Sequence, residues 1–219
     1  MNNKQLINRL KSNAELAMAS YGYFHLIGKN FDNKRNKTEV KRTIALHDIL
    51  DSTYKGYVTS EHTTLINPEE LDGDFAPIQT KNFFDRYELI KHCPNTDSGF
   101  SATLFGEKRK QTHTESKEVS YTADYGYTNY TLAIRGTEFK LEQIQDLLND
   151  YYIGTNNSDM NRVIEQYFDM LLFYEETLKP LLQEKGIARI NVVGHSLGGY
   201  LAQLFALSYP HSINEVYTY

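Results

Sequence analysis

The chain has 219 residues, 40% of them hydrophobic and 23% charged, which excludes a mainly disordered protein because this composition supplies a sizeable apolar core. Its single cysteine, Cys93, excludes an intramolecular disulfide, and no apolar run approaches the roughly 18 residues that a membrane span needs. The net charge of −5 is unevenly distributed along the chain, since residues 1–43 hold nine lysines and arginines against three acidic residues. The basic cluster at 34–42 has no interleaved aromatic residues, so it predicts a solvated loop without a nucleic-acid partner.

The first predicted element is an amphipathic helix over residues 4–26, where apolar residues recur every three to four positions. Residues 14–28 resemble the core of a signal peptide, but Glu15 and His25 within them favour the helix. We therefore expect a cytoplasmic protein, or one exported without an N-terminal signal. Residues 44–70 show no clear period and receive no assignment.

A β-hairpin is predicted next. Two short apolar segments, residues 86–92 and 100–105, flank a cluster of turn-forming residues. The charged tract 107–118 predicts an exposed loop, and residues 129–135 predict a strand that stops at Gly136.

A long amphipathic helix is predicted from Ser158 or Asp159, either of which can cap it, to about Lys185. Gly186 follows as expected of a C-terminal cap, and Pro180 should kink or divide the helix.

Strands and helices alternate from residue 129 onward, which is typical of a parallel sheet covered by helices. The other members of this series are a helix within 139–152, a strand at 187–193, a helix at 197–209 and a strand at 215–219. The sequence thus predicts an α/β fold.

The most informative segment is Gly194-His195-Ser196-Leu197-Gly198, a G-x-S-x-G sequence between a predicted strand and a predicted helix. A sharp turn there would hold the Ser196 hydroxyl clear of its surroundings, and the two glycines would remove side chains that collide across the turn. The Leu197 N–H, at the helix start, has no partner within the helix and can stabilise an oxyanion. This pattern predicts a serine nucleophile.

Arg135-Gly136-Thr137, at the end of a neighbouring strand, supplies a second part. The Thr137 N–H, and its hydroxyl, could reach the oxyanion from the other side. By itself such a tripeptide is more often an ordinary turn, but the serine turn about 60 residues later favours the functional interpretation.

These two segments resemble the class 3 lipase family, within the α/β-hydrolase fold. Residues 132–137 (Leu-Ala-Ile-Arg-Gly-Thr) resemble the family's oxyanion strand and loop, and residues 192–199 (Val-Val-Gly-His-Ser-Leu-Gly-Gly) resemble its nucleophile segment. The resemblance covers about residues 129–219 and is weak before them.

The resemblance implies ester hydrolysis through an acyl-enzyme, with Ser196 as nucleophile, Thr137 and Leu197 as the oxyanion hole, and no metal or organic cofactor. His195 holds a position that is structural in the family. In fungal members a lid follows the oxyanion loop, and residues 139–152 fall there; a fixed helix packed into the core is an equally good interpretation. Asp72-Gly73-Asp74 is too short a fragment of a calcium loop to predict a metal site.

A general base and its orienting acid are harder to place. In α/β-hydrolases the acid and the histidine both follow the serine in the chain. After Ser196 the candidates are His211 and Glu215, and neither lies where the fold places its base or its acid. We therefore expect one α/β-hydrolase domain over residues 1–219, incomplete at its C-terminus, with the core at 129–219 and N-terminal helices and a hairpin at 1–128. The acid and histidine would then lie beyond Tyr219, and the 219 residues alone should hydrolyse esters poorly.

Three functions remain open. The first is a lipase or phospholipase acting on a lipid or other ester, with transient contact to a lipid surface. The second is a catalytically silent α/β-hydrolase module that binds lipid or protein. The third is another acyl transfer at the same serine, such as that of a thioesterase or acyltransferase, because the fold and the serine turn alone do not specify the acyl donor.

Overall fold

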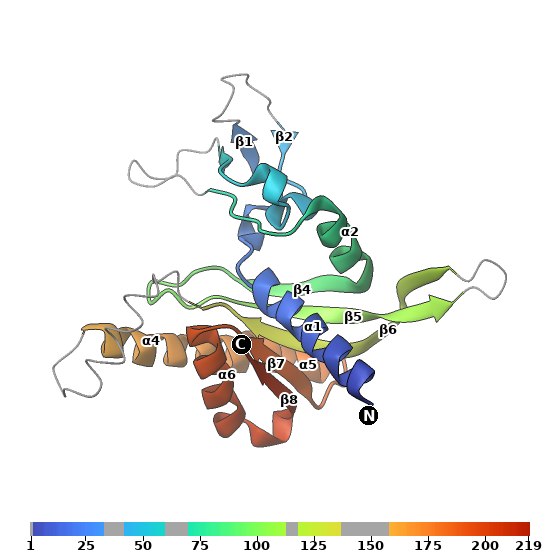
Figure 1. Cartoon of the computed structure of the whole chain (residues 1–219). Coiled ribbons are helices and arrows are strands. Elements are labelled where there is room, and N and C mark those ends of the chain that lie inside the picture. The colour runs from blue at the N-terminus through green and yellow to red at the C-terminus, as the bar shows by residue number, and fades with distance from the viewer. Residues whose placement is uncertain (1, 33–41, 60–69, 113–117, 137–157) are drawn as a thin grey trace. The chain divides into compact units, whose positions relative to one another are not determined.

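The structure is a computed structural model that describes residues 2–32, 42–59, 70–112, 118–136 and 158–219 (Figure 1). The chain divides into two compact units. The first comprises Met1–Ser20, Cys93–Leu104 and Tyr130–Tyr219, and the second comprises Tyr21–His92 and Phe105–Asn129.

Two sheets organise the described residues. Five strands form a sheet of order β4-β5-β6-β7-β8, and three short strands form a second sheet of order β2-β1-β3. The strands of the larger sheet are β4 (Tyr87–Cys93), β5 (Ala102–Thr112), β6 (Val119–Ile134), β7 (Ile190–Gly194) and β8 (Ile213–Thr218).

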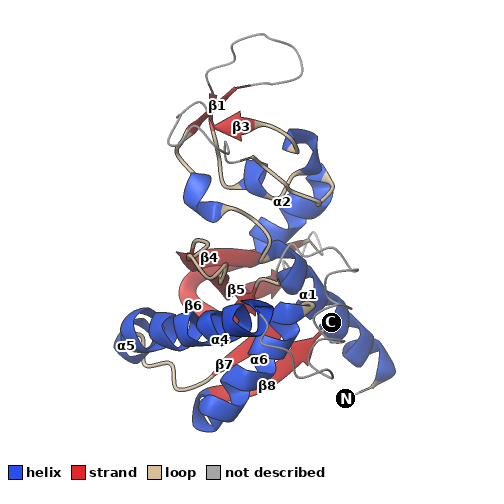
Figure 2. Ribbon diagram, turned by 90° about the vertical axis from the view of Figure 1, so that its left-hand side faces the viewer, coloured by secondary structure: helices blue, strands red, loops and turns tan. Residues whose placement is uncertain are grey.

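The parallel part of the larger sheet lies in the first unit. β6 pairs in parallel with β7, and β7 pairs in parallel with β8. Helix α6 (Leu197–Ser208) packs against β7 and β8, α4 (Ser158–Phe173) packs against α6, and α1 (Asn3–Ala19) packs against β7 (Figure 2). This mixed, mostly parallel sheet flanked by helices confirms the predicted α/β-hydrolase-like fold.

The core of the first unit explains why its elements form. Val192 and Val193 on β7 are fully buried, as are Leu201 and Phe205 on α6, so both elements contribute apolar faces to one layer. Burying each such side chain contributes about 2 kcal/mol.

The second unit has an aromatic core and a polar network. Its aromatic core includes Phe24, Phe83 and Phe105, whose rings meet edge to face at centroid separations of 5.5 to 5.8 Å. The other elements of this unit are β1 (Asn30–Asp32), β2 (Arg42–Thr43), β3 (Val58–Thr59), α2 (Pro77–Arg86) and three short 3-10 helices at Phe24–Leu26, His47–Ile49 and Ser52–Tyr54.

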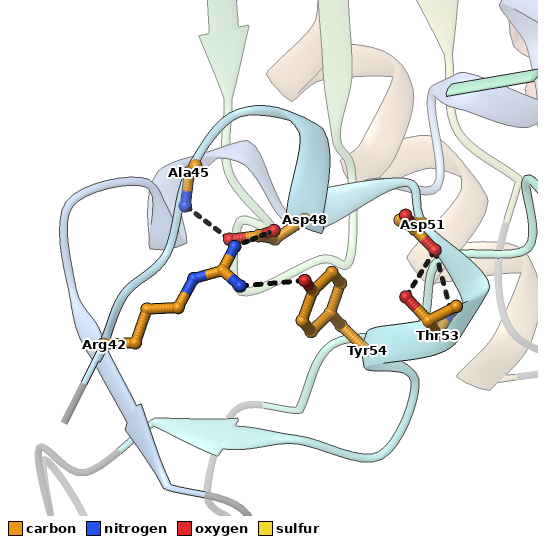
Figure 3. A network of polar contacts seen from close by, with 6 residues as sticks. All are labelled: Arg42, Ala45, Asp48, Asp51, Thr53 and Tyr54. Atoms are coloured by element: carbon orange, nitrogen blue, oxygen red, sulfur yellow. Dashed lines mark hydrogen bonds and ion pairs between the residues drawn. The ribbon is translucent and has the colours of Figure 1, made fainter. Parts of the chain in front are cut away.

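The polar network of this unit centres on Asp48, which is only 3% exposed (Figure 3). Asp48 accepts hydrogen bonds from Arg42 at 2.5 Å and from the Ala45 N–H at 2.8 Å. The Arg42 guanidinium also donates to the Tyr54 hydroxyl at 2.8 Å and lies 4.9 Å from that ring's centroid. The hydrogen bond to Tyr54, together with the negative charge of Asp48, raises the pKa of Arg42. The network fastens β2 to the two 3-10 helices that follow it.

Several predicted boundaries were wrong. The first helix ends at Ala19 instead of residue 26. Ser20 caps it, because the Ser20 N–H donates to the Leu16 carbonyl and the Ser20 hydroxyl donates to the Ala17 carbonyl at 2.7 Å. Residues 107–112 continue β5 instead of forming a loop, and β6 begins at Val119, ten residues before the predicted strand. Backbone pairing maintains these strands although many of their side chains are exposed.

The long helix near residue 180 is divided, as predicted. A π-helical turn at Tyr174–Leu178 separates α4 from α5 (Lys179–Glu184), and Pro180 lies in the first turn of α5. Proline has no N–H to continue the α-helical ladder, which accounts for the break. Gly186, with φ +67°, follows the end of α5. Among the described residues, no helix is long and apolar enough to cross a membrane.

Candidate functional site

The site is built on the turn between β7 and α6. Ser196, at this turn, has φ +55° and ψ −128°, and within the described ranges it is the only residue other than glycine with positive φ. This backbone conformation costs an L-residue about 1 to 3 kcal/mol, and such strain concentrates at functional sites. The predicted strained serine turn is therefore present in the structure.

Glycines at both ends of the turn make it possible. A Cβ on Gly194 would lie 2.1 Å from the Gly198 carbonyl oxygen, and a Cβ on Gly198 would lie 2.3 Å from the Ile134 carbonyl oxygen. Both distances are far below van der Waals contact, so no side chain fits at either position. The motif's two glycines thus bring the start of α6 against β7 and against the end of β6.

Backbone hydrogen bonds hold the turn in place. The Ser196 N–H donates to the Tyr219 carbonyl at 2.8 Å, and the Tyr219 N–H donates to the Gly194 carbonyl at 3.0 Å. The Tyr219 hydroxyl donates to the Leu10 carbonyl of α1 at 2.6 Å, and burial raises the pKa of this phenol. Sequence reasoning missed the contribution of Tyr219, because hydrogen bonds between backbone atoms leave no signal in residue type.

Two polar groups at the start of α6 are not used by the helix itself. The Ser196 side chain does not cap α6. Within the described part of the chain, the Leu197 N–H donates to no acceptor, whereas the next two N–H groups bond back to His195 and Ser196. An unused N–H beside a serine hydroxyl at a helix N-terminus can stabilise negative charge on a substrate oxygen.

The end of β6 lies beside this turn. Ile134 on β6 is in register with Gly194 on β7, so the residues that follow both strands are neighbours. A Cβ on Gly198 would also lie 2.8 Å from the Arg135 carbonyl carbon and 2.9 Å from the Gly136 nitrogen. The structure thus brings the start of the predicted oxyanion loop to the serine. Thr137 itself lies outside the described residues, as does the 139–152 segment.

The two acid and base candidates after Ser196 lie elsewhere. His211 is in a 3-10 turn (Pro210–Ser212) beyond the far end of α6. Glu215 pairs with Asn191, three pairs before Gly194 in the β7–β8 register. It forms an ion pair with Arg9 of α1 and accepts a hydrogen bond from the Tyr217 hydroxyl at 2.7 Å. Neither residue is at the serine turn, and His195, beside the serine, is exposed.

The Asp72 and Asp74 carboxylates both pair with one lysine. The Lys55 ammonium lies 2.7 Å from a carboxylate oxygen of each, and these hydrogen bonds raise the pKa of Lys55. In the ranges that the structure describes, no group of three or more His, Cys, Asp or Glu side chains could hold a metal ion.

Known proteins resemble parts of this chain. The family model for class 3 lipases matches residues 131–215. Protein ECM18 of Saccharomyces cerevisiae is 38% identical over 66 residues, which are 30% of this chain and 14% of that protein. The 1-acylglycerol-3-phosphate O-acyltransferase ICT1 of the same yeast is 34% identical over 58 residues, which are 26% of this chain and 14% of that protein.

Solved lipase structures share the fold. A lipase from Rhizopus microsporus var. chinensis superposes with a TM-score of 0.51 at 14% identity, and the match covers all of this chain and 58% of that one. The nonglycosylated LIP2 lipase of Yarrowia lipolytica gives a TM-score of 0.50 at 19% identity, covering 99% of this chain and 59% of that one. This chain therefore spans about three fifths of the length of the solved lipases that it matches.

Proposed function

Because residues 131–215 match the family model for class 3 lipases, we propose that this protein is a serine hydrolase of carboxylic esters with lipid substrates, and that Ser196 is its nucleophile. The observation that carries the proposal is the backbone of Ser196, held at φ +55° between β7 and α6. If this position only had to turn the chain, a glycine would adopt the same conformation without strain. A serine at this strained position therefore indicates a role for its hydroxyl.

The proposed reaction has two steps. Ser196 Oγ attacks the ester carbonyl carbon, the carbonyl oxygen becomes an oxyanion, and the bond to the alcohol breaks as the alcohol leaves with the serine proton. Water then attacks the acyl-enzyme, releases the carboxylic acid and restores the serine hydroxyl. The N–H groups of Leu197 and Thr137 are the proposed donors to the oxyanion, and one such donor contributes roughly 10² to 10³ in rate.

The proposal assigns no general base, because His211 and Glu215 lie away from the serine turn. The test therefore uses the protein at the length that its gene encodes. We expect it to hydrolyse a short-chain p-nitrophenyl ester and expect Ser196→Ala to abolish this activity. Turnover that survives Ser196→Ala would refute the proposal, and an inert protein would favour a silent binding module.

A second candidate differs in what accepts the acyl group. The similarity to a 1-acylglycerol-3-phosphate O-acyltransferase, 34% identical over 58 residues, favours transfer to an alcohol acceptor as an alternative to water. Both reactions share the same acyl-enzyme at Ser196. Adding a lysophospholipid to the ester assay separates them, since a transferase forms diacyl product at the expense of free acid.

A further inference from the structure

The connection between β4 and β5, residues 94–101, carries polar groups into the interior of the first unit. Ser98 is 7% exposed and Ser101 is 1% exposed. The loop folds tightly on itself, with the Thr96 N–H donating to the Phe100 carbonyl at 2.9 Å and the Gly99 N–H donating to the Thr96 carbonyl at 2.9 Å. Buried polar groups require partners, and here the partners lie on two other elements.

On one side the loop is bonded to α4. The Ser98 hydroxyl donates to Asp169 Oδ2 at 2.7 Å, and Gln166 Nε2 donates to the Ser98 carbonyl at 2.9 Å. Gln166 is 1% exposed, so this hydrogen bond is shielded from water. The two α4 residues are three apart, which places both on the same helix face.

On the other side the loop is bonded to the end of β6. The Arg135 N–H donates to the Ser101 carbonyl at 3.0 Å, and Arg135 Nη1 donates to Asn95 Oδ1 at 3.4 Å. Arg135 is only 4% exposed although it is charged. The Ser101 hydroxyl donates to the Cys93 carbonyl at 2.8 Å, which fixes the base of the loop.

The serine turn packs against the backbone of Arg135 and of its two neighbours. Gly198 approaches the Arg135 carbonyl carbon and the Gly136 nitrogen so closely that no side chain fits between them. A displacement of Arg135 would therefore move the backbone that leads into the oxyanion loop relative to Ser196. Oxyanion donors must be held to within about 0.5 Å of their working position.

A hydrogen-bonded support suits this task better than an apolar one. A buried hydrogen bond has a defined direction and a defined length, which apolar contact does not impose. The loop has such bonds on both sides, to α4 and to β6.

We propose that the 94–101 loop positions the oxyanion end of β6, with Asp169 and Asn95 as positioning residues for the acyl transfer. This inference rests on the proposed function, because it presumes that the backbone after Arg135 stabilises an oxyanion. Neither side chain touches the substrate. Each acts through the loop and Arg135 on the geometry that the transition state requires.

The test measures kcat and KM separately for ester hydrolysis by the protein at its encoded length. Asp169→Ala and Asn95→Ala should each lower kcat about tenfold and leave KM within about twofold, because an oxyanion contact is made in the transition state and not in substrate binding. Asp169→Asn and Asn95→Asp retain an acceptor oxygen and should restore kcat. Glu165→Ala removes an exposed carboxylate from the same helix and serves as the matched control, with unchanged kinetics.

Two outcomes would overturn the inference. Wild-type kcat in Asp169→Ala and in the exposed-site variant Asn95→Ala would show that the loop is structural, whatever happens to the melting temperature. A fall in kcat that the acceptor-retaining variants do not restore would show that the hydrogen bonds are not its cause. Ser196→Ala tests the proposed function separately from this inference. If Ser196 is the nucleophile, Ser196→Ala abolishes turnover even when the loop variants keep wild-type kcat.

Discussion

A methyl group at Gly198 is the smallest change that should separate the serine turn from the end of β6. In Gly198→Ala the new Cβ would lie 2.3 Å from the Ile134 carbonyl oxygen, and ordinary contact begins at 3.4 Å, so the two backbones must part by about 1 Å. A displacement of about 1 Å in a catalytic site costs about 100-fold in rate. We therefore expect kcat for a p-nitrophenyl ester to fall about 100-fold.

The neighbouring glycine provides the control. In Gly199→Ala the new Cβ would lie 3.2 Å from the Gly194 carbonyl oxygen and 3.3 Å from Thr218 Cβ, so the surroundings need to yield by only a few tenths of an ångström. Alanine is favoured over glycine in a helix by about 1 kcal/mol, so helix propensity opposes any loss of stability in both variants. If Gly198→Ala kept wild-type kcat and melting temperature, the close approach of α6 to β6 would be refuted.

Three further predictions concern stability and reactivity. Ser196→Gly should be about 1 kcal/mol more stable than Ser196→Ala by urea denaturation, because glycine adopts φ +55° without strain; equal stabilities would contradict the strained turn. Burial, with the nearby Asp169 carboxylate, raises the pKa of the Cys93 thiol to about 11. Iodoacetamide should therefore alkylate Cys93 about 100-fold more slowly at pH 8 in the folded protein than in the unfolded one, and the rate in the folded protein should rise with pH up to about 11. Equal rates in the two states would contradict this burial. Asp48→Ala should lower the free energy of unfolding by about 2 kcal/mol, because Arg42 and the Ala45 N–H lose a buried acceptor; a loss below about 0.5 kcal/mol would show that the network in Figure 3 contributes little.

The serine turn was predictable from sequence because its determinants are local. The β-branched run of β7, the two glycines around Ser196 and the apolar residues of α6 occur within 20 consecutive residues. Each requires the same backbone path, so pattern and structure agree there. The break near Pro180 was predictable for the same reason, since proline affects only the turn in which it stands.

The hydrogen bonds of the 94–101 loop were not predictable, because they join residues far apart in the chain. Ser98 and Asp169 are 71 residues apart and are brought together by the fold of the first unit. The extent of β5 was missed for a different reason: residues 109–112 are exposed and polar, so they lack the alternation by which strands are recognised. Backbone pairing holds them in the sheet without any such pattern.

The most direct test of the nucleophile assignment is to treat the protein at its encoded length with a fluorophosphonate and map the adduct by peptide mass spectrometry. Such a probe phosphonylates a serine only when that serine is activated. We expect one adduct, on Ser196, that is absent from Ser196→Ala and slower to form in Gly198→Ala. An unlabelled Ser196, or an adduct on another residue that persists in Ser196→Ala, would contradict this assignment.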